Sequence, residues 1–311
     1  MRKYLLKRIG LAIGIVFAIS LITFIILNII PGDPAALMLG DMASPETIAK
    51  LREQMGLDRP LPEQYIAWIF RLITGDLGNS YFQKKPVLEL IGYALYYTSR
   101  LAICAYAIAL IIGITSGVIA AVFQGKAVDR ILMTIAIMGI SAPAFWVAIL
   151  LQIYIALNFD IFPVSGANEP IGFVLPSIAL GSRYAASIAR ITRTSMIETM
   201  NQDFIKTARA KGLKNYRIIL VHALRNALLP IVTVIGSDIG SLLAGAMLTE
   251  SVFNIPGIGK LLIDAINKRD LPIVQGTVMY IATVCVLIYL IVDILYAVID
   301  PRIKLGEGSS E

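Results

Sequence analysis

Residues 9–30 decide the fold class, and they read IGLAIGIVFAISLITFIILNII. This run of 22 residues carries no charge. As an α-helix it is long enough to cross a hydrocarbon core of about 30 Å. The apolar region of a cleaved signal peptide is shorter, roughly 7–15 residues, and a small-residue cleavage site follows it. We therefore expect a retained transmembrane helix at this position.

Five further apolar runs follow the first one. They cover residues 101–123, 131–157, 173–189, 227–249 and 273–299. Only 15% of the 311 residues are charged, against roughly 25% in soluble domains. The runs are continuous rather than alternating, which favours helices over barrel strands as the way to satisfy all backbone groups in a bilayer. The sequence therefore predicts an all-α integral membrane protein with six transmembrane helices.

Several residues within these runs are expected to disturb or tighten the helix packing. The fourth run is short and contains Arg183, and Pro143 and Pro176 lie in the third and fourth runs. We expect both prolines to kink their helices where neighbouring helices can bond the freed carbonyls. Three glycine pairs have the small-xxx-small spacing that allows close helix approach: Gly10/Gly14, Gly113/Gly117 and Gly236/Gly240.

Basic residues in the connections predict the orientation. In a six-span count the N-terminus, the second and fourth connections and the tail share one side. The two short connections on the other side hold no Lys or Arg (158–172) and three (Lys260, Lys268 and Arg269). Both termini are therefore expected in the cytoplasm, and the net charge of +6 needs no nucleic-acid partner. The basic residues of the first side are Arg2, Lys3, Lys7, Arg8, Lys126, Arg130, Arg190, Arg193, Lys206, Arg209, Lys211, Lys214, Arg217, Arg225, Arg302 and Lys304.

This orientation places the long segment 31–100 outside the cell. Its charges nearly balance and residues 45–55 have a helical composition, so we expect a small folded subdomain rather than a linker. Five aromatic residues give that subdomain side chains to bury: Tyr65, Trp68, Phe70, Tyr81 and Phe82. The expected organisation is an N-terminal end and first helix (1–30), this external subdomain (31–100), a five-helix core (101–300) and a cytoplasmic tail (301–311).

The connection 190–226 is long, basic and rich in helix formers. Asp203 is a candidate N-cap and Gly212 a candidate left-handed stop, which predicts a short helix, a turn and a second helix leading into the fifth span. Small residues at Thr207, Ala208 and Ala210 leave room for another protein surface to approach. A solvated positive-inside loop is the alternative interpretation.

A resemblance to a known family bears on this alternative. Thr207–Gly212 reads TARAKG and His222–Ala227 reads HALRNA, which resembles the signature loop of binding-protein-dependent ABC importer permeases of the peptide type. Lys206 and Thr207 take the places of the acidic residue and first Ala found in the more general pattern. The resemblance extends along the chain, to the first-subunit type of a dipeptide, oligopeptide or nickel permease pair. Its other segments are 30–34 (IPGDP), 55–62 (MGLDRPLP), 75–80 (GDLGNS), 162–166 (FPVSG), 250–259 (ESVFNIPGIG), 269–272 (RDLP) and 293–302 (DILYAVIDPR).

The resemblance implies a type I importer permease fold and a set of partners. These are a second homologous permease subunit forming a heterodimer, two cytoplasmic ATPase subunits, and an external solute-binding protein that delivers di- or oligopeptides at a bacterial or archaeal inner membrane. A coupling helix would dock on the ATPase. The chain lacks GxxxxGK[ST], so ATP and Mg would be used by the partner subunits and no cofactor is expected on this chain. The implied coupling residues are Asp203, Thr207, Ala208, Arg209, Ala210, Lys211 and Gly212.

Ionisable residues inside the spans are candidates for the translocation path. Asp238, flanked by two glycines, and Arg183 could each line the path or bond a neighbouring helix, and Asp293 is expected to anchor the end of the sixth span. The alternatives are a nickel or metal-chelate permease of the same family and a stand-alone secondary transporter that uses these charges as an ion relay. His222 has no nearby His or Cys, and Cys104 and Cys285 form no CxxC motif, so no metal or redox site is expected.

Overall fold

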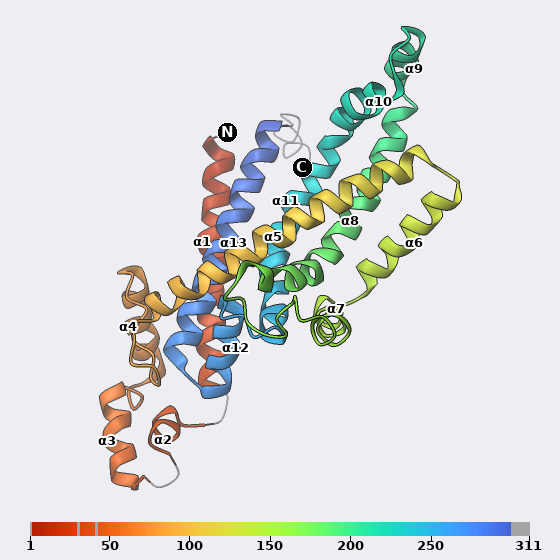
Figure 1. Ribbon diagram of the computed structural model, residues 1–311. Helices are drawn as coiled ribbons and strands as arrows, with labels where there is room; N and C mark the ends of the chain where they lie inside the picture. Colours follow the sequence, from red (N-terminus) through yellow and green to blue (C-terminus); the bar gives the residue numbers. More distant parts are fainter. Residues whose placement is uncertain (1, 30–31, 41–42, 300–311) are drawn as a thin grey trace. The chain divides into compact units, whose positions relative to one another are not determined.

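The computed structural model describes residues 2–29, 32–40 and 43–299 (Figure 1). Within these ranges the chain is helical and contains no β-strand, only an isolated antiparallel bridge between Asn79 and Pro86. The predicted tail 301–311 and the side chain of Asp293 lie outside the described residues. The helices are α1 (Arg2–Ile29), α2 (Pro34–Leu39), α3 (Pro45–Met55), α4 (Leu61–Ile73), α5 (Val87–Val122), α6 (Ala127–Ser141), α7 (Ala144–Leu151), η1 (Gln152–Ala156), η2 (Pro170–Phe173), α8 (Val174–Met200), α9 (Asp203–Ala210), α10 (Asn215–Arg217), η3 (Ile218–Ala223), α11 (Leu224–Val252), α12 (Ile258–Lys268) and α13 (Leu271–Ile299).

The chain divides into two compact units. Unit 1 contains the residues up to Tyr97 together with those from Pro256 onward, and unit 2 contains residues from Thr98 to Ile255. The boundary falls within α5, which begins in unit 1 and continues into unit 2. Each unit therefore combines segments that are distant in the sequence.

Unit 1 is built on α1 and α13, which lie side by side (Figure 1). Helix α4 packs on this pair, and its Trp68 is buried together with Phe24 of α1 and Met279 of α13. Of the five aromatic residues expected to supply side chains for burial, Trp68 is buried, whereas Phe70 and Phe82 are exposed.

Unit 2 is built around α8, which packs against α6, α7 and α11. Most of its buried side chains are small, and two glycines of α5 face it without space for a side chain. A Cβ atom on Gly113 would lie 2.8 Å from the Ala185 carbonyl oxygen, and one on Gly117 would lie 2.6 Å from that of Ala189. This predicted glycine pair therefore does permit close helix approach.

Four helical segments are long and apolar enough to cross a membrane: Arg8–Ile29, Val87–Val122, Pro170–Met200 and Leu271–Val292. If each of two bent helix pairs counts as one span, the described residues hold up to six candidate spans. In one pair, α6 meets the helix that follows Pro143 at 104°, so the expected kink is a complete break. The kink expected at Pro176 is wrong, because this residue lies in the first turn of α8, where the missing N–H is tolerated. Helix α5 begins at Val87, well before the predicted start at residue 101.

The six-span prediction assigns each connection to one side of the membrane. Within each unit, contacts between connections are consistent with these assignments. In unit 2, Asp129 at the start of α6 bonds Arg193 near the end of α8. At the opposite end, the Gly166 amide donates to the carbonyl of Phe253. In unit 1, Ser80 donates to Asp270 at the start of α13. Connections assigned to the same side are therefore in contact.

Candidate functional site

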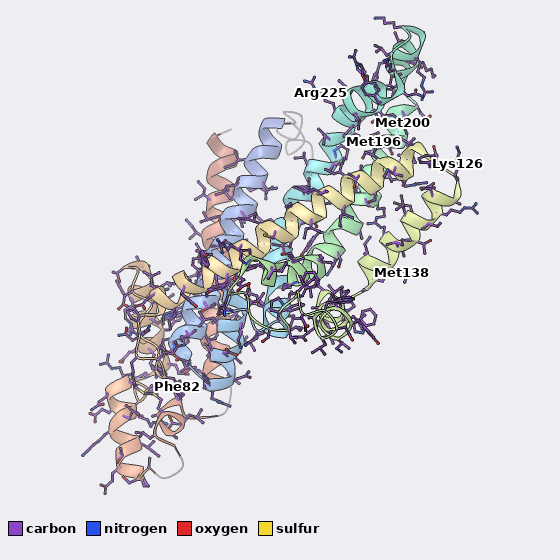
Figure 2. All side chains as sticks on the ribbon, in the orientation of Figure 1. Phe82, Lys126, Met138, Met196, Met200 and Arg225 are labelled. Atoms are coloured by element: carbon purple, nitrogen blue, oxygen red, sulfur yellow. The ribbon has the colours of Figure 1, made fainter. Side chains whose placement is uncertain are left out.

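The connection between α8 and α11 forms a helix, a turn and a second helix, as predicted. Figure 2 shows Met200 and Arg225 at the two ends of this connection, with α9 and α10 between them. The N-cap of α9 is Gln202. The predicted N-cap, Asp203, is instead the first residue of the helix. The Asp203 carboxylate instead accepts a hydrogen bond from Lys206 over 2.8 Å, on the exposed side of the helix.

The turn after α9 depends on Gly212. Its φ is +75°, in the left-handed region, and a Cβ atom would meet nothing within 4 Å. The constraint at this position is therefore the backbone conformation rather than a lack of space. The predicted left-handed stop is confirmed.

One face of α9 attaches the helix to the rest of unit 2. Ile205 and Ala208 are buried, and α9 packs against η3. The expectation that Ala208 leaves room for another protein is therefore wrong, because the chain itself covers it. Below α9 lies a cavity of about 350 Å³, lined by Val122, Gln124, Met200, Arg209, Asn215 and Ile219 among others.

The other face of α9 and the following turn are exposed. This face carries the aromatic ring of Phe204 and four cationic side chains, and it includes most of the predicted coupling residues. The exposed residues are Asp203, Phe204, Lys206, Thr207, Arg209, Ala210, Lys211, Gly212 and Lys214. The segment therefore presents a basic surface with one aromatic residue, held in place by Ile205 and Ala208.

An ion pair fixes the end of α8 from which α9 departs. Arg193 donates from Nε to Asp129 Oδ1 over 2.6 Å and from Nη2 to Asp129 Oδ2 over 2.8 Å. The Gly125 amide donates to the same carboxylate. Asp129 is almost fully buried. Two-pronged geometry of this kind fixes both position and orientation, so α8, the start of α6 and the turn before α6 are joined at this point.

The two predicted path residues lie in one polar cluster inside unit 2. Arg183 of α8 and Asp238 of α11 are close enough to interact electrostatically. Tyr106 of α5 joins them: its hydroxyl donates to the Ile235 carbonyl over 2.7 Å and interacts with Asp238. Arg183 is exposed in this chain and Asp238 is half-buried. Three helices therefore contribute polar groups at one level of the unit.

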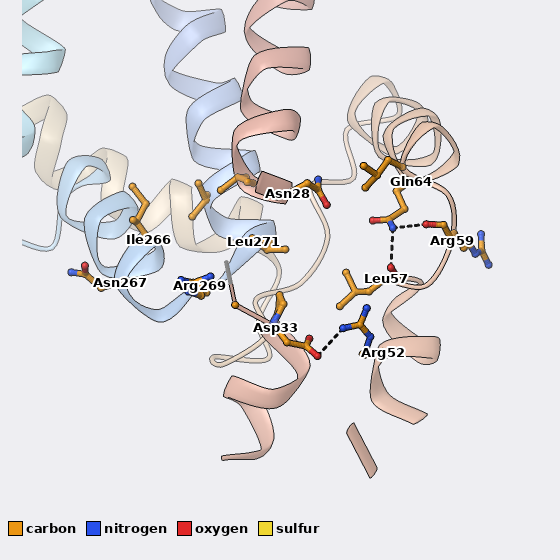
Figure 3. A pocket seen from close by; sticks show the side chains of 15 residues that line it. Asn28, Asp33, Arg52, Leu57, Arg59, Gln64, Ile266, Asn267, Arg269 and Leu271 are labelled. Atoms are coloured by element: carbon orange, nitrogen blue, oxygen red, sulfur yellow. Dashed lines mark hydrogen bonds and ion pairs between the residues drawn. The ribbon is translucent and has the colours of Figure 1, made fainter. Parts of the chain in front are cut away.

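Unit 1 contains a cavity of about 710 Å³ that is lined by both polar and apolar side chains (Figure 3). An ion pair between Asp33 and Arg52 (2.9 Å) spans it, and Gln64 Nε2 donates to the carbonyls of Leu57 and Arg59. The carboxylates of Asp58 and Asp33 raise the pKa of Arg52. Arg269, with a left-handed φ of +57°, also lines this cavity.

Beside that cavity, a buried carboxylate links the loop before α5 to the start of α13. Asp270 accepts hydrogen bonds from the hydroxyl of Ser80 and from the amide of Tyr81. Burial and the Asp270 charge raise the pKa of Tyr81 to about 12. The loop before α5 is therefore fixed to the first turn of α13.

Several of these residues were not predicted from the sequence, among them Tyr106, Asp129, Arg193 and Asp270. The signal available for Asp129 was a charged residue at the start of an apolar run, and Asp270 lies in the segment RDLP (269–272) that carries part of the family resemblance. In the part of the chain that the structure describes, no group of three or more His, Cys, Asp or Glu side chains could hold a metal ion.

Comparisons with known proteins identify relatives over the whole length. The family model described as binding-protein-dependent transport system inner membrane component matches residues 113–305, and the model of its N-terminal part matches residues 1–102. The chain is 41% identical over 336 residues to the dipeptide transport system permease protein DppB of Escherichia coli K12, covering 98% of this chain and 99% of that protein. It is 40% identical over 332 residues to DppB of Alkalihalophilus pseudofirmus (98% and 100%) and 39% identical over 312 residues to a putative peptide transport system permease of Brucella abortus (98% and 99%).

Solved structures show a similar fold. Two inward-facing crystal forms of the MetNI methionine ABC transporter match 68% of this chain and 97% and 96% of their own chains. The TM-scores are 0.55 and 0.57, at 17% and 18% sequence identity. The fold is that of a type I importer permease.

Proposed function

This chain belongs to the family of binding-protein-dependent transport system inner membrane components, and from this premise we propose that it is one permease subunit of an ATP-driven peptide importer. Relatives named for dipeptide or peptide transport align with the chain from end to end, which supports peptides as the cargo. The observation that carries the proposal is the helix, left-handed turn and helix at residues 203–217, attached by one face and exposed on the other.

We assign the exposed face of α9 to an ATPase subunit. Phe204 supplies an apolar anchor, and the surrounding lysines and arginines suit an acidic rim on the partner. The ATPase activity then belongs to the partner subunits, which use ATP and Mg. Two such subunits would serve a heterodimer of this chain and a second homologous permease, and an external binding protein would deliver the peptide.

The attachment of α9 provides the mechanical link. Helix α9 follows α8 after only Asn201 and Gln202, and Ile205 holds it against the permease. A displacement of α9 when the ATPase closes is passed to α8. Because α8 is the most buried candidate span of unit 2, with 67% of its most apolar stretch inside the structure, its neighbours move with it. Alternating access follows from that movement.

The polar cluster of Tyr106, Arg183 and Asp238 is proposed to line the path. A free peptide carries one ammonium and one carboxylate group, and the cluster offers one charge of each sign. Ionisable groups at this depth face a water-filled path or a helix partner. Asp238→Asn should reduce peptide uptake while leaving subunit assembly intact, and unchanged uptake would assign Asp238 to packing alone.

The orientation completes the proposal. The connection 190–226 must face the cytoplasm to meet an ATPase, which agrees with its high content of Lys and Arg. Both termini then lie in the cytoplasm of a bacterial or archaeal cell. Residues 31–86, which follow the first span, belong to the outer side of the membrane.

The test uses the assembled complex in liposomes with peptide-loaded binding protein. Gly212→Val should lower binding-protein-stimulated ATP hydrolysis and peptide uptake together, because a β-branched residue in the left-handed region costs roughly 1–2 kcal/mol. That cost corresponds to a roughly 5- to 30-fold loss if coupling requires this turn. Gly212→Asn is the matched control, since Asn tolerates this conformation, and it should retain most of the activity.

Two outcomes would overturn separate parts of the proposal. If Gly212→Val couples ATP hydrolysis to peptide uptake as well as the wild type does, residues 203–217 do not transmit the closure of the ATPase. A wild-type complex that hydrolyses ATP but is stimulated by no peptide-loaded binding protein would remove peptides as the cargo and leave the coupling assignment standing.

A further inference from the structure

Helix α4 (Leu61–Ile73) presents three chemically different faces. Tyr65, Trp68 and Leu72 face α1 and α13. Gln64 and Arg71 line a cavity of about 420 Å³ together with Glu53, Tyr81 and Gln275. The third face carries Ile66, Phe70 and Ile73, whose exposed fractions are 55%, 67% and 77%. Large apolar side chains gathered on one exposed face mark a contact with an apolar partner.

The inner face of α4 fixes its depth along the first span. Trp68 stacks on Phe24 with ring centroids 6.1 Å apart, and the Tyr65 hydroxyl bonds the Ser20 hydroxyl over 2.9 Å. Phe24 precedes the end of the charge-free run at residue 30 by six residues and Ser20 by ten. At 1.5 Å per residue these positions lie about 9 and 15 Å below the end of the run.

The same depth follows from the last span. Met279 packs against Trp68 and follows the start of α13 at Leu271 by eight residues, which is about 12 Å. Two independent helices therefore place the middle of α4 well inside the thickness of the spans. A helix in an aqueous subdomain would pack beyond their ends.

Among the described residues, the groove beside the C-terminal half of α4 is lined almost entirely by apolar side chains. An apolar groove of about 390 Å³ runs from Ile69, Leu72 and Ile73 onto Ile13 and Val16 of α1 and Val286 of α13. Two hydroxyls line it, and both are bonded: Ser20 donates to the Phe17 carbonyl and Thr283 to the Met279 carbonyl. The exposed stripe of α4 thus continues into a surface that offers only hydrocarbon.

We infer that α4 is embedded in the bilayer and that Ile66, Phe70 and Ile73 contact lipid acyl chains. The leaflet is the one on the side of residues 31–86, the outer leaflet in the orientation proposed above. The polar face of α4 remains satisfied because Gln64 and Arg71 turn to the cavity, as an interfacial amphipathic helix requires. Residues 31–86 are therefore only partly external, which revises the expectation from the sequence. The inference depends on α1 and α13 spanning the membrane, and not on the cargo or on the ATPase.

The test measures which solvent surrounds this face. A nitroxide is attached to Phe70→Cys, and independently to Ile73→Cys, in a Cys104→Ala/Cys285→Ala background of the full complex in liposomes. Accessibility is measured to oxygen, which concentrates in lipid, and to a water-soluble nickel chelate. The matched control is Lys50→Cys on the exposed surface of α3. The oxygen-to-nickel ratio at residue 70 should exceed that at residue 50 roughly tenfold or more, as for a side chain buried about 5–10 Å into the bilayer.

Two results would overturn the inference. A ratio at residues 70 and 73 equal to that at residue 50 would place α4 in water. Protection from both reagents at both positions would show that protein covers this face, which would assign it to the second permease subunit instead of lipid.

Discussion

Helix α1 is strongly apolar but mostly exposed, whereas helix α8 is less apolar but mostly buried. The most apolar stretch of α1 has only 17% of its residues buried, whereas that of α8 has 67%. Yet α1 is the more uniformly apolar of the two, and α8 contains Ser, Thr and Arg residues within its span. In a soluble protein the more apolar helix would be expected at the centre.

The difference follows from the solvent. Lipid tails are as apolar as leucine, so a leucine- and isoleucine-rich helix gains little by packing against another helix. Close packing of small residues and hydrogen bonds favour association instead. Helix α8 buries Ala179, Gly181, Ala185 and Ala189, while most of the large side chains of α1 remain exposed. Small residues therefore identify α8, the central helix of unit 2, better than hydropathy does.

The largest effect is expected when the same change, Gly to Leu, is made separately in α5, which packs on α8, and in α1. Gly117→Leu places a Cβ atom 2.6 Å from the Ala189 carbonyl oxygen and 2.6 Å from Thr192 Cβ, so α5 and α8 must separate. We expect a loss of about 3 kcal/mol or more of stability. Gly14→Leu in α1 meets nothing within 4 Å and should change stability by about 1 kcal/mol or less. Thermal unfolding of the purified complex in detergent measures both.

Equal damage from the two substitutions would contradict the comparison. It would show that α1 packs through Gly14 on a partner subunit, because no atom of the part of the chain that the structure describes lies within 4 Å of a Cβ atom at this position.

A smaller effect is expected at the ion pair that fixes α8. Asp129→Ala leaves the Arg193 guanidinium and the Gly125 amide without the carboxylate that they share. Removing one partner of a buried pair costs about 3–5 kcal/mol, and we expect about 2 kcal/mol here because Arg193 remains partly exposed. Chemical denaturation of the complex measures the change.

Two controls accompany this prediction. Asp203→Ala removes an ion pair in which both side chains are largely exposed, and no measurable change in stability is expected. The double variant Asp129→Ala/Arg193→Met should recover part of the loss, because it also removes the charge left without its partner. Failure to recover would show that Asp129 acts mainly through the Gly125 turn.

The apolar segments could be predicted, since a bilayer imposes a minimum length on every span, and the predicted six spans agree with the structure when each bent helix pair counts as one. The turn at Gly212 could also be predicted, since a glycine that follows a short helical segment is a recognised stop. Both features are local, and each depends on a few neighbouring residues rather than on the arrangement of the helices.

The parts that could not be predicted depend on which helix faces meet. The interaction of Arg183 with Asp238 depends on how α8 and α11 are rotated about their axes, and the sequences of the two runs do not specify that rotation. Ala208 was assigned to the docking surface because it is small, but the packing of α9 buries it. The position of α4 depends on Tyr65 reaching Ser20, 45 residues away, and no local pattern encodes that contact.

The smallest expected effect concerns the face of α1 that packs against α4. Ser20→Ala removes the hydrogen bond to the Tyr65 hydroxyl, and we expect a loss of about 0.6 kcal/mol, the average for hydrogen bonds between helices in membranes. Tyr65→Phe should cost the same, and the double variant should cost no more than either single one. Thr283→Val is the control, because the Thr283 hydroxyl bonds only a carbonyl of its own helix. If Ser20→Ala changes the thermal unfolding of the complex no more than Thr283→Val does, then α4 is held on α1 by Trp68 and its apolar neighbours alone.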